Sequence, residues 1–362
     1  MTFEEKKNAF VALGQFLGQF RADGHTPNTE VLNNDLASLS ATESRIFFDS
    51  FTDLIHLSQS HNGWYTPENV YFSIQSWANA LTEQNLNQWL SKYNFEKNTS
   101  KTVGLVLAGN IPLVGFHDFM CVILSGHKVQ VKTSSNDQHL LPFLANYLIS
   151  IVPELKNYIS FTEGKLKDYD AVIATGSNNT ARYFDYYFKD KPSIIRKNRN
   201  SVAILNGTET KADLEALGED IFRYFGLGCR NVSKIFVPKD YVFDSFFEGI
   251  FKYKDVIEYE KYANNYDYNK AVFLMSNFKL LDNGFLTIKE DASYSSPISS
   301  VFYEFYDHLD NLKLKLAADA DAIQCIVSNH LIPNSIPFGK TQQPELWDYA
   351  DGVDTLDFLA SL

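Results

Sequence analysis

The sequence predicts an α/β protein in which a helical N-terminal region precedes a parallel-sheet domain and a second α/β domain. Residues 103–108 form a continuous apolar run, which is typical of a strand that is covered on both faces. Further expected strands at residues 128–132 and 171–174 are separated by an expected helix at residues 138–151. Because strands that alternate with helices indicate a parallel sheet, we expect one in this segment.

The first 95 residues or so are predicted to be helical, because their apolar residues recur at helical spacing. Thr2 and Glu5 have the spacing of a capping box, and Thr66-Pro67-Glu68 predicts a second helix start. Nothing in this region points to chemistry. We divide the chain into four parts. Residues 1–100 are an N-terminal helical region that packs on the nucleotide-binding domain at residues 101–205. Residues 206–334 form a second α/β domain that carries the Cys229 stretch, and residues 335–362 are a C-terminal segment.

Several polar residues follow directly on the expected strands. Asn110 comes after the first strand, Lys132 ends the second, and Gly176-Ser177 follows the third. Ligands of open parallel sheets bind beyond the carboxyl ends of the strands. These residues are therefore candidate ligand-binding residues.

The stretch around Cys229 is the most informative one in the chain. Leu214, Leu217, Ile221 and Phe225 recur at helical spacing before it, and residues 234–237 are predicted to form a buried strand after it. Glycines at positions 226 and 228 allow a sharp turn, so the thiol is predicted to be displayed as a nucleophile. The alternative is that Cys229 is a small buried hydrophobe, since a single cysteine has no partner specified by spacing.

Composition excludes several classes of function. The 362 residues include 32 Lys or Arg and 44 Asp or Glu, a net charge of −12, which argues against a nucleic-acid partner. Three cysteines without a CxxC motif argue against a disulfide framework or a zinc site, and we predict no metal. No apolar run has membrane-spanning length and no signal core is visible, so we expect a soluble cytoplasmic protein.

The linker at residues 189–199 is locally basic, unlike the rest of the chain. One interpretation is a solvated loop, and the other is a docking patch for a ligand phosphate.

Four separated segments together resemble the aldehyde dehydrogenase superfamily. They are Gly-Asn110-Ile-Pro with the following Gly126–Lys132, then Thr175-Gly176-Ser177, then Gly-Leu-Gly-Cys229-Arg-Asn-Val-Ser, and finally Pro337-Phe-Gly339. Within the superfamily, the cysteine loop and the late Tyr-Ala-Asp-Gly-Val-Asp-Thr stretch are most similar to the LuxC-type acyl-CoA reductases. The resemblance implies an aldehyde dehydrogenase-like fold. It also implies reduction of an acyl-CoA or other acyl thioester to the aldehyde by a nicotinamide cofactor.

The resemblance also implies roles for individual residues. Cys229 matches the nucleophile and Asn110 the side-chain donor to the oxyanion. Lys132 matches the lysine that contacts the adenosine ribose, and Gly176-Ser177 matches the turn near the cofactor diphosphate. The chain allows two kinds of protein partner, a second copy of itself in a homo-oligomer or an acyl-transferring protein.

Three departures from the superfamily pattern affect these expectations. A glycine of the cofactor turn is replaced by Ala181, which is small enough to keep close packing. The glutamate that activates the deacylating water in oxidising enzymes has no counterpart at residues 195–200, where Arg196 falls closest to its position. Without that base an acyl-cysteine is hydrolysed slowly, which suits capture by hydride. Ser135 stands where a carboxylate would repel a 2′-phosphate, so we expect NADPH. The alternative is that Ser135 merely caps the next helix, and the two roles can coexist.

The proton donor, the two other cysteines and two rival functions complete the expectations. His117 and Asp118 are candidate proton donors, although a lone helical histidine is more often packed. Cys121 and Cys325 lie in apolar surroundings and are predicted to be core residues. The rivals are an oxidising NAD(P)-dependent aldehyde dehydrogenase, and a catalytically silent nucleotide-binding or assembly protein.

Overall fold

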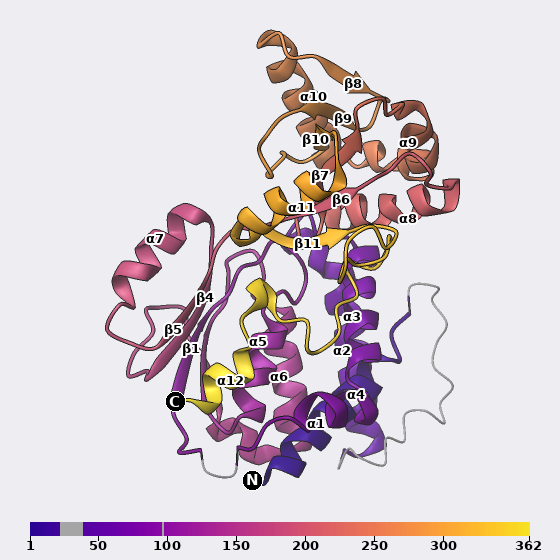
Figure 1. The fold of residues 1–362 in the computed structure, drawn as a ribbon. Coiled ribbons are helices and arrows are strands. Elements are labelled where there is room, and N and C mark those ends of the chain that lie inside the picture. The colour runs from indigo at the N-terminus through magenta and orange to yellow at the C-terminus, as the bar shows by residue number, and fades with distance from the viewer. Residues whose placement is uncertain (22–38, 96–97) are drawn as a thin grey trace. The chain divides into compact units, whose positions relative to one another are not determined.

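The structure, a computed structural model, describes residues 1–21, 39–95 and 98–362. It divides into two compact units: unit 1 is Met1–Lys197 with Glu345–Leu362, and unit 2 is Asn198–Pro344. Figure 1 shows the elements of both. In residues 1–21, 39–95 and 98–362, no helix combines the length and apolarity needed to cross a membrane.

Unit 1 begins with four helices, as the sequence predicts. The predicted capping box at Thr2 and Glu5 is present, and the helix predicted at Pro67 begins there after the N-cap Thr66. The apolar faces of these helices pack into one core with the helices of the following sheet. The helices are α1 (Phe3–Leu17), α2 (Ala41–His61), α3 (Pro67–Ala80) and α4 (Glu83–Leu90).

The first sheet, sheet A, is entirely parallel in strand order β3-β2-β1-β4-β5. The predicted apolar strand is the central one, with its middle residues buried. This confirms the expected alternation of strands and helices. Its elements are β1 (Thr102–Val106), α5 (Phe116–Leu124), β2 (Lys128–Lys132), α6 (Leu140–Ile151), the 3₁₀ turn η2 (Pro153–Asn157), β3 (Ile159–Phe161), β4 (Ala171–Thr175), α7 (Asn178–Tyr187) and β5 (Ser193–Arg196).

Unit 2 is built on sheet B, in strand order β11-β6-β7-β10-β9-β8, where β8 alone pairs antiparallel among the described strands. Its strands are β6 (Asn200–Ile204), β7 (Val232–Pro238), β8 (Leu280–Asp282), β9 (Thr287–Glu290), β10 (Ser300–Tyr306) and β11 (Ile323–Val327). Its helices are α8 (Lys211–Phe222), η3 (Arg223–Gly226), α9 (Phe243–Ile250), η4 (Phe251–Glu258), α10 (Glu260–Met275), α11 (Leu309–Ala318) and η5 (Ala320–Ala322). The sequence places residues 200–204 in the first α/β domain, whereas β6 pairs with β7 and β11 of sheet B.

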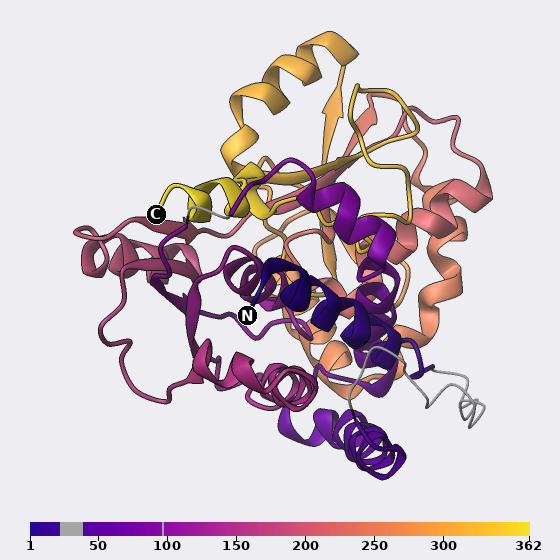
Figure 2. The same ribbon diagram turned by 90° about the horizontal axis from the view of Figure 1, so that it is seen from below.

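The C-terminal segment is shared between the units, because residues 335–344 belong to unit 2 and residues 345–362 return to unit 1. There, η6 (Ala350–Gly352) and α12 (Thr355–Ala360) follow, and α12 packs against α5. Figure 2 shows α1 in indigo and α12 in yellow in this unit.

Hydrogen bonds connect the returning segment to α4 and to Tyr93, which follows that helix. Trp89 Nε1 donates to the Tyr349 hydroxyl (2.8 Å), and the Tyr93 and Tyr349 hydroxyls bond each other (2.7 Å). The Tyr93 hydroxyl donates to the Asp354 carboxylate (2.7 Å).

The contact between α1 and α3 depends on Gly14. A Cβ at this position would lie 2.6 Å from the backbone oxygen of Leu81. We predict that Gly14→Ala lowers the free energy of unfolding by about 1–3 kcal/mol, because backbone has to shift to admit the methyl group. Gly18→Ala is the matched control, since its Cβ would meet atoms only at 3.5 Å or more. Urea denaturation of both variants checks this, and equal stabilities would contradict it.

Candidate functional site

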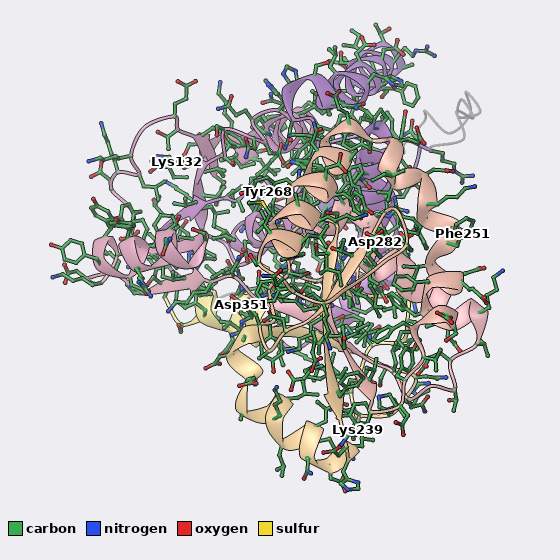
Figure 3. The ribbon with its side chains drawn as sticks, turned by 90° about the horizontal axis from the view of Figure 1, so that it is seen from above. Lys132, Lys239, Phe251, Tyr268, Asp282 and Asp351 are labelled. Carbon is green, nitrogen blue, oxygen red and sulfur yellow. The ribbon has the colours of Figure 1, made fainter. Side chains whose placement is uncertain are left out.

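The carboxyl edge of sheet A brings together the predicted cofactor residues of unit 1. The strand register pairs Lys132 of β2 with Val106 of β1, and Val106 with Ala174 of β4. The turns that carry Asn110 and Gly176 follow directly on β1 and β4. Figure 3 labels Lys132 on this unit. The sequence-predicted residues of unit 1 therefore share one sheet edge, while Cys229 belongs to unit 2.

The turn after β2, residues 133–139, is called the cofactor turn below. Lys132 at its start is half-buried, and Ser135 within it is exposed. The N-cap of α6 is His139, so Ser135 does not cap that helix. The capping explanation for Ser135 is therefore wrong. Within the described residues no carboxylate forms an ion pair with Lys132, and the one acid of the turn, Asp137, accepts a hydrogen bond from the Leu113 N–H (3.4 Å).

The turn after β4 is closely packed. Ser177 is the N-cap of α7, and its side chain accepts a hydrogen bond from the Thr180 N–H (3.3 Å). A Cβ at Gly176 would lie 3.0 Å from the Phe184 ring and from Thr180. Ala181 is fully buried, which fits the expectation that a small residue suffices there. The absence of a side chain at Gly176 therefore lets α7 pack closely against the end of β4.

The turn after β1, Gly109–Leu113, carries Asn110 and is called the Asn110 turn. Asn110 itself is exposed at a bend. Gly109 packs directly on the cofactor turn, because a Cβ there would lie 2.7 Å from Ser134 Oγ. The two turns at this edge are thus in contact through backbone and small side chains.

The loop before Cys229 departs from the helix that the sequence predicts through Phe225. Helix α8 ends at Phe222, and Tyr224, Phe225 and Gly226 all have left-handed backbone angles, with φ of 53°, 57° and 78°. Such angles are strained for two residues with large side chains, so neighbouring contacts must impose them. Cys229 is exposed, as the display hypothesis predicts, and its carbonyl accepts a hydrogen bond from Ser201 Oγ of β6 (3.0 Å).

Asn231 holds this loop in shape. Its Oδ1 accepts from the N–H of Gly228 at 2.8 Å, just before Cys229. Its Nδ2 donates to the backbone carbonyls of Asp220 (3.0 Å) and Arg223 (2.8 Å) at the end of α8. Asn231 was not among the predicted site residues, although asparagine in a glycine-containing loop is a signal of such a turn.

Asp220 joins the Cys229 loop to the Pro337-Phe-Gly339 motif. Its buried carboxylate accepts from the N–H of Gly339 (2.7 Å) and from the N–H (3.0 Å) and hydroxyl (2.8 Å) of Thr341. The Thr341 carbonyl in turn accepts from Arg230 Nε at 2.7 Å, next to Cys229. Burial raises the pKa of Asp220 to about 6, although these hydrogen bonds oppose the shift. The late motif therefore supports the cysteine loop, a role that spacing could not reveal.

Arg196, which the resemblance puts closest to the position of the missing glutamate, is buried in an ion pair with Asp118 of α5. Its Nη2 and Nε bond the two carboxylate oxygens at 2.7 and 3.2 Å, and Nη1 donates to the Ala350 carbonyl at 2.7 Å. Nη2 also donates to the Thr355 hydroxyl (2.9 Å). Burial would raise the pKa of Asp118, but the charge and hydrogen bonds of Arg196 lower it below its ordinary value. The position holds a cation engaged in structure, not a base.

The other titratable candidates are also engaged. His117 is buried, bonds the Leu346 carbonyl through Nε2 (2.8 Å), and has its pKa lowered by burial. The sequence had made it and Asp118 candidate proton donors, and both are packed inside unit 1. In the basic stretch, Arg199 contacts the carbonyls of Ala320 and Ile323, so it and Arg196 are held by protein groups. Cys121 and Cys325 are buried, which confirms their prediction as core residues.

Comparison of the sequence with known proteins matches it to one family. Residues 61–245, about half of the chain, match the family model described as acyl-CoA reductase (LuxC). A curated relative, long-chain acyl-protein thioester reductase 2 of Photobacterium leiognathi, is 27% identical over 194 residues, 49% of this chain and 40% of the relative. The chain therefore matches less than half of that relative's length.

Comparison of the structure finds aldehyde dehydrogenases. Aldehyde dehydrogenase 21 of Physcomitrella patens, in complex with succinate, has a TM-score of 0.68 at 11% identity, covering 100% of this chain and 84% of that one. The putative aldehyde dehydrogenase PutA of Anabaena variabilis has a TM-score of 0.59 at 14% identity, covering 90% and 78%. A Mycobacterium tuberculosis aldehyde dehydrogenase complexed with NAD⁺ has a TM-score of 0.58 at 14% identity, covering 90% and 73%. These matches confirm the predicted aldehyde dehydrogenase-like fold.

The ion pair at Arg196 generates a stability prediction. Arg196→Met leaves the Asp118 carboxylate buried without its cation, so we expect a loss of about 3–5 kcal/mol of unfolding free energy. The double variant Arg196→Met with Asp118→Leu is expected to recover most of that loss, since no charge is then left buried.

Lys197→Ala is the control, because its pair with Asp185 is exposed and 3.5 Å long, and it is expected to cost less than about 1 kcal/mol. Chemical denaturation at neutral pH measures all three variants. Equal costs for Arg196→Met and Lys197→Ala would show that burial of the pair is unimportant.

Proposed function

Because this chain belongs to the acyl-CoA reductase (LuxC) family, we propose that it reduces an acyl-CoA thioester to the aldehyde through an acyl-cysteine at Cys229, with NADPH as reductant. The observation that supports this best is the exposed Cys229 on a turn held by Asn231 and Asp220. A thiol that is exposed on a backbone turn held by such hydrogen bonds is suited to nucleophilic attack. The relative named as an acyl-protein thioester reductase agrees with a thioester as the acyl donor.

In the proposed mechanism the Cys229 thiolate attacks the thioester carbonyl, and coenzyme A leaves as a thiolate. The Asn110 side-chain amide and the N–H of Cys229 stabilise the oxyanion, and one such donor is typically worth about 3–4 kcal/mol of barrier. When bound, the nicotinamide cofactor supplies the hydride that reduces the acyl group. The resulting thiohemiacetal on Cys229 collapses to aldehyde and restores the thiol.

The buried state of Arg196 favours reduction over oxidation. An oxidising enzyme needs a base that activates water for attack on the acyl-cysteine. Arg196 is a cation, and the nearby Asp118 carboxylate is occupied by it. The acyl-cysteine is therefore protected from hydrolysis and remains available to hydride. The rival of a catalytically silent protein is disfavoured by the number of contacts that support an exposed cysteine.

Replacement of Cys229 tests the proposal directly. We predict that Cys229→Ala abolishes both covalent acylation by acyl-CoA and acyl-CoA-dependent NADPH oxidation, while cofactor binding persists. Intact-protein mass spectrometry detects the acyl-enzyme, and aldehyde trapping detects the product. Cys121→Ser and Cys325→Ser are controls, because both thiols are buried. An acyl-enzyme that still forms on Cys229→Ala would overturn the nucleophile assignment.

The cofactor turn and the turn after β4 provide residues suited to NADPH. Lys132 and Ser135 offer a cation and a hydroxyl with which a ribose 2′-phosphate can form charge-assisted hydrogen bonds. The N-terminus of α7 after Ser177 offers backbone N–H groups for the diphosphate, and Gly176 shapes the turn before it, its own N–H donating to the Arg196 carbonyl (3.3 Å). Position 135 itself carries a hydroxyl in place of a carboxylate, and the nearby Asp137 carboxylate accepts from the Leu113 N–H (3.4 Å); the neutral side chain at position 135 is the feature that favours NADPH over NADH.

We predict that Ser135→Glu lowers kcat/KM for NADPH by about 10-fold or more and changes that for NADH by much less, because the new carboxylate repels the 2′-phosphate. Since Ser135 does not cap α6, the variant should keep the wild-type melting temperature. Steady-state kinetics with both cofactors measure the ratio. A higher kcat/KM for NADH in the wild-type protein, or an equal loss with both cofactors, would contradict the proposed role.

A further inference from the structure

The Asn110 turn is held by side chains of the N-terminal region, in which the sequence showed no chemistry. Three of its backbone carbonyls accept hydrogen bonds from side chains that lie near the end of α2 and in α3. All three donor residues are buried. The hydrogen bonds run from Asn62 Nδ2 to Gly109 (3.4 Å), from the Tyr65 hydroxyl to Ile111 (2.9 Å) and from Ser73 Oγ to Pro112 (3.0 Å).

The sequence of the turn explains why it needs this support. Pro112 has no N–H to donate, and Leu113 has a left-handed backbone angle (φ 58°), so the turn cannot complete a regular hydrogen-bond pattern of its own. The Leu113 N–H instead donates to Asp137 Oδ2 at 3.4 Å. Asp137 lies in the cofactor turn just before α6, so this hydrogen bond links the two turns.

Asn62 connects the Asn110 turn to the cofactor turn. Its Nδ2 is shared between the carbonyls of Gly109 and Asn136, the latter at 3.2 Å. Its Oδ1 accepts from the Trp64 N–H at 3.0 Å, which fixes the orientation of the amide. Asn62 and Asp137 therefore both connect the Asn110 turn to the cofactor turn, beside the contact between Gly109 and Ser134.

We propose that Asn62 and Asp137 are positioning residues, which hold the Asn110 turn against the cofactor turn and so orient the Asn110 amide for acylation of Cys229. Neither residue touches substrate in this proposal, and both act through Asn110. The inference rests on the proposed function for its chemical consequence, but the restraint on the turn is a property of unit 1 alone. A displacement of about 1 Å in a catalytic group can lower a rate about 100-fold.

The test is a double-variant cycle on the acylation step. The rate of acyl-enzyme formation from acyl-CoA is measured without cofactor for wild type, Asn62→Ala, Asn110→Ala and the double variant. We expect Asn62→Ala to slow acylation about 10- to 100-fold in the wild-type background. In the Asn110→Ala background the same change is expected to have less than about a 2-fold effect, since Asn62 acts through the residue already removed.

Two further variants keep the test decisive. Asn62→Asp retains the acceptor for Trp64 and turns a carboxylate oxygen, which repels them, toward the Gly109 and Asn136 carbonyls, so it releases the turn in the same way and serves as a second test of the restraint. Asp137→Asn removes one of two acceptor oxygens and is expected to slow acylation in the same way. Asp170→Asn is its control, since Asp170 Oδ2 accepts from the Thr102 N–H (2.8 Å) at the other end of sheet A.

Asn98→Ala is the control for Asn62, because the Asn98 amide donates to a backbone carbonyl, that of Ser125, at the same 3.2 Å as one of the Asn62 bonds. It is expected to leave the acylation rate unchanged. Equal losses from Asn62→Ala in both backgrounds, or an equal loss from Asn98→Ala, would show a general effect on the fold and overturn the positioning role.

Hydrogen–deuterium exchange of residues 109–114 separates this inference from the proposed function. Asn62→Ala is expected to raise amide exchange in that segment, with little change at sheet A strands. If wild type forms no acyl-enzyme, the proposed function fails while exchange still decides whether Asn62 holds the turn. Exchange that is the same as in wild type overturns the inference, whatever the acylation result.

Discussion

The architecture of unit 1 depends on the buried ion pair between Arg196 and Asp118, because it joins the last strand of sheet A, helix α5 and the returning C-terminal segment. Two charges are costly to bury, and the cost is offset here only because both carboxylate oxygens and all three guanidinium nitrogens have partners. The sign of its pH dependence follows from the pKa of Asp118, which is below its ordinary value. The pair stabilises the fold above the unfolded-state pKa of the carboxyl and ceases to do so as the pH falls through the lowered pKa.

The Cys229 turn shows how a strained backbone is maintained. Left-handed angles at Tyr224 and Phe225 are unfavourable for residues with large side chains, and the loop persists because Asn231 bonds both sides of it. Phe225 is further supported by stacking on Tyr259, with ring centroids 4.6 Å apart. Rigidity at this point has a chemical use, since a nucleophile that is already oriented loses little freedom on reaching the transition state.

Sequence reasoning was most successful where the pattern is local. The apolar run at β1, the capping box at Thr2 and the proline start of α3 depend on neighbouring residues, and the structure confirms them. The family motifs indicated Asn110 and Cys229 for the same reason, although their roles stay predictions. The helix expected through Phe225 was wrong because contacts from distant residues override helical periodicity there. The supports at Asn62, Asp137 and Asp220 were missed because each bonds residues 24 to 121 positions away, and no spacing rule reports such pairs.

Asp137 and Asp220 are both buried carboxyls whose pKa is raised by burial. Burial raises the pKa of each carboxyl to about 6, above the ordinary value of 3.8. The folded state therefore holds the proton more tightly than the unfolded chain, so each group stabilises the fold at low pH and loses that contribution as the pH rises through about 6.

Near neutral pH the Asp137 and Asp220 carboxyls are both ionised at a cost in stability, and a neutral side chain would avoid that cost. What an ionised carboxylate provides is acceptor capacity, for the Leu113 N–H in one case and for the N–H groups of Gly339 and Thr341 in the other. Both sets of donors belong to segments that support the turns of Asn110 and Cys229. The two acidic residues are thus better explained by the geometry of those turns than by the stability of the fold.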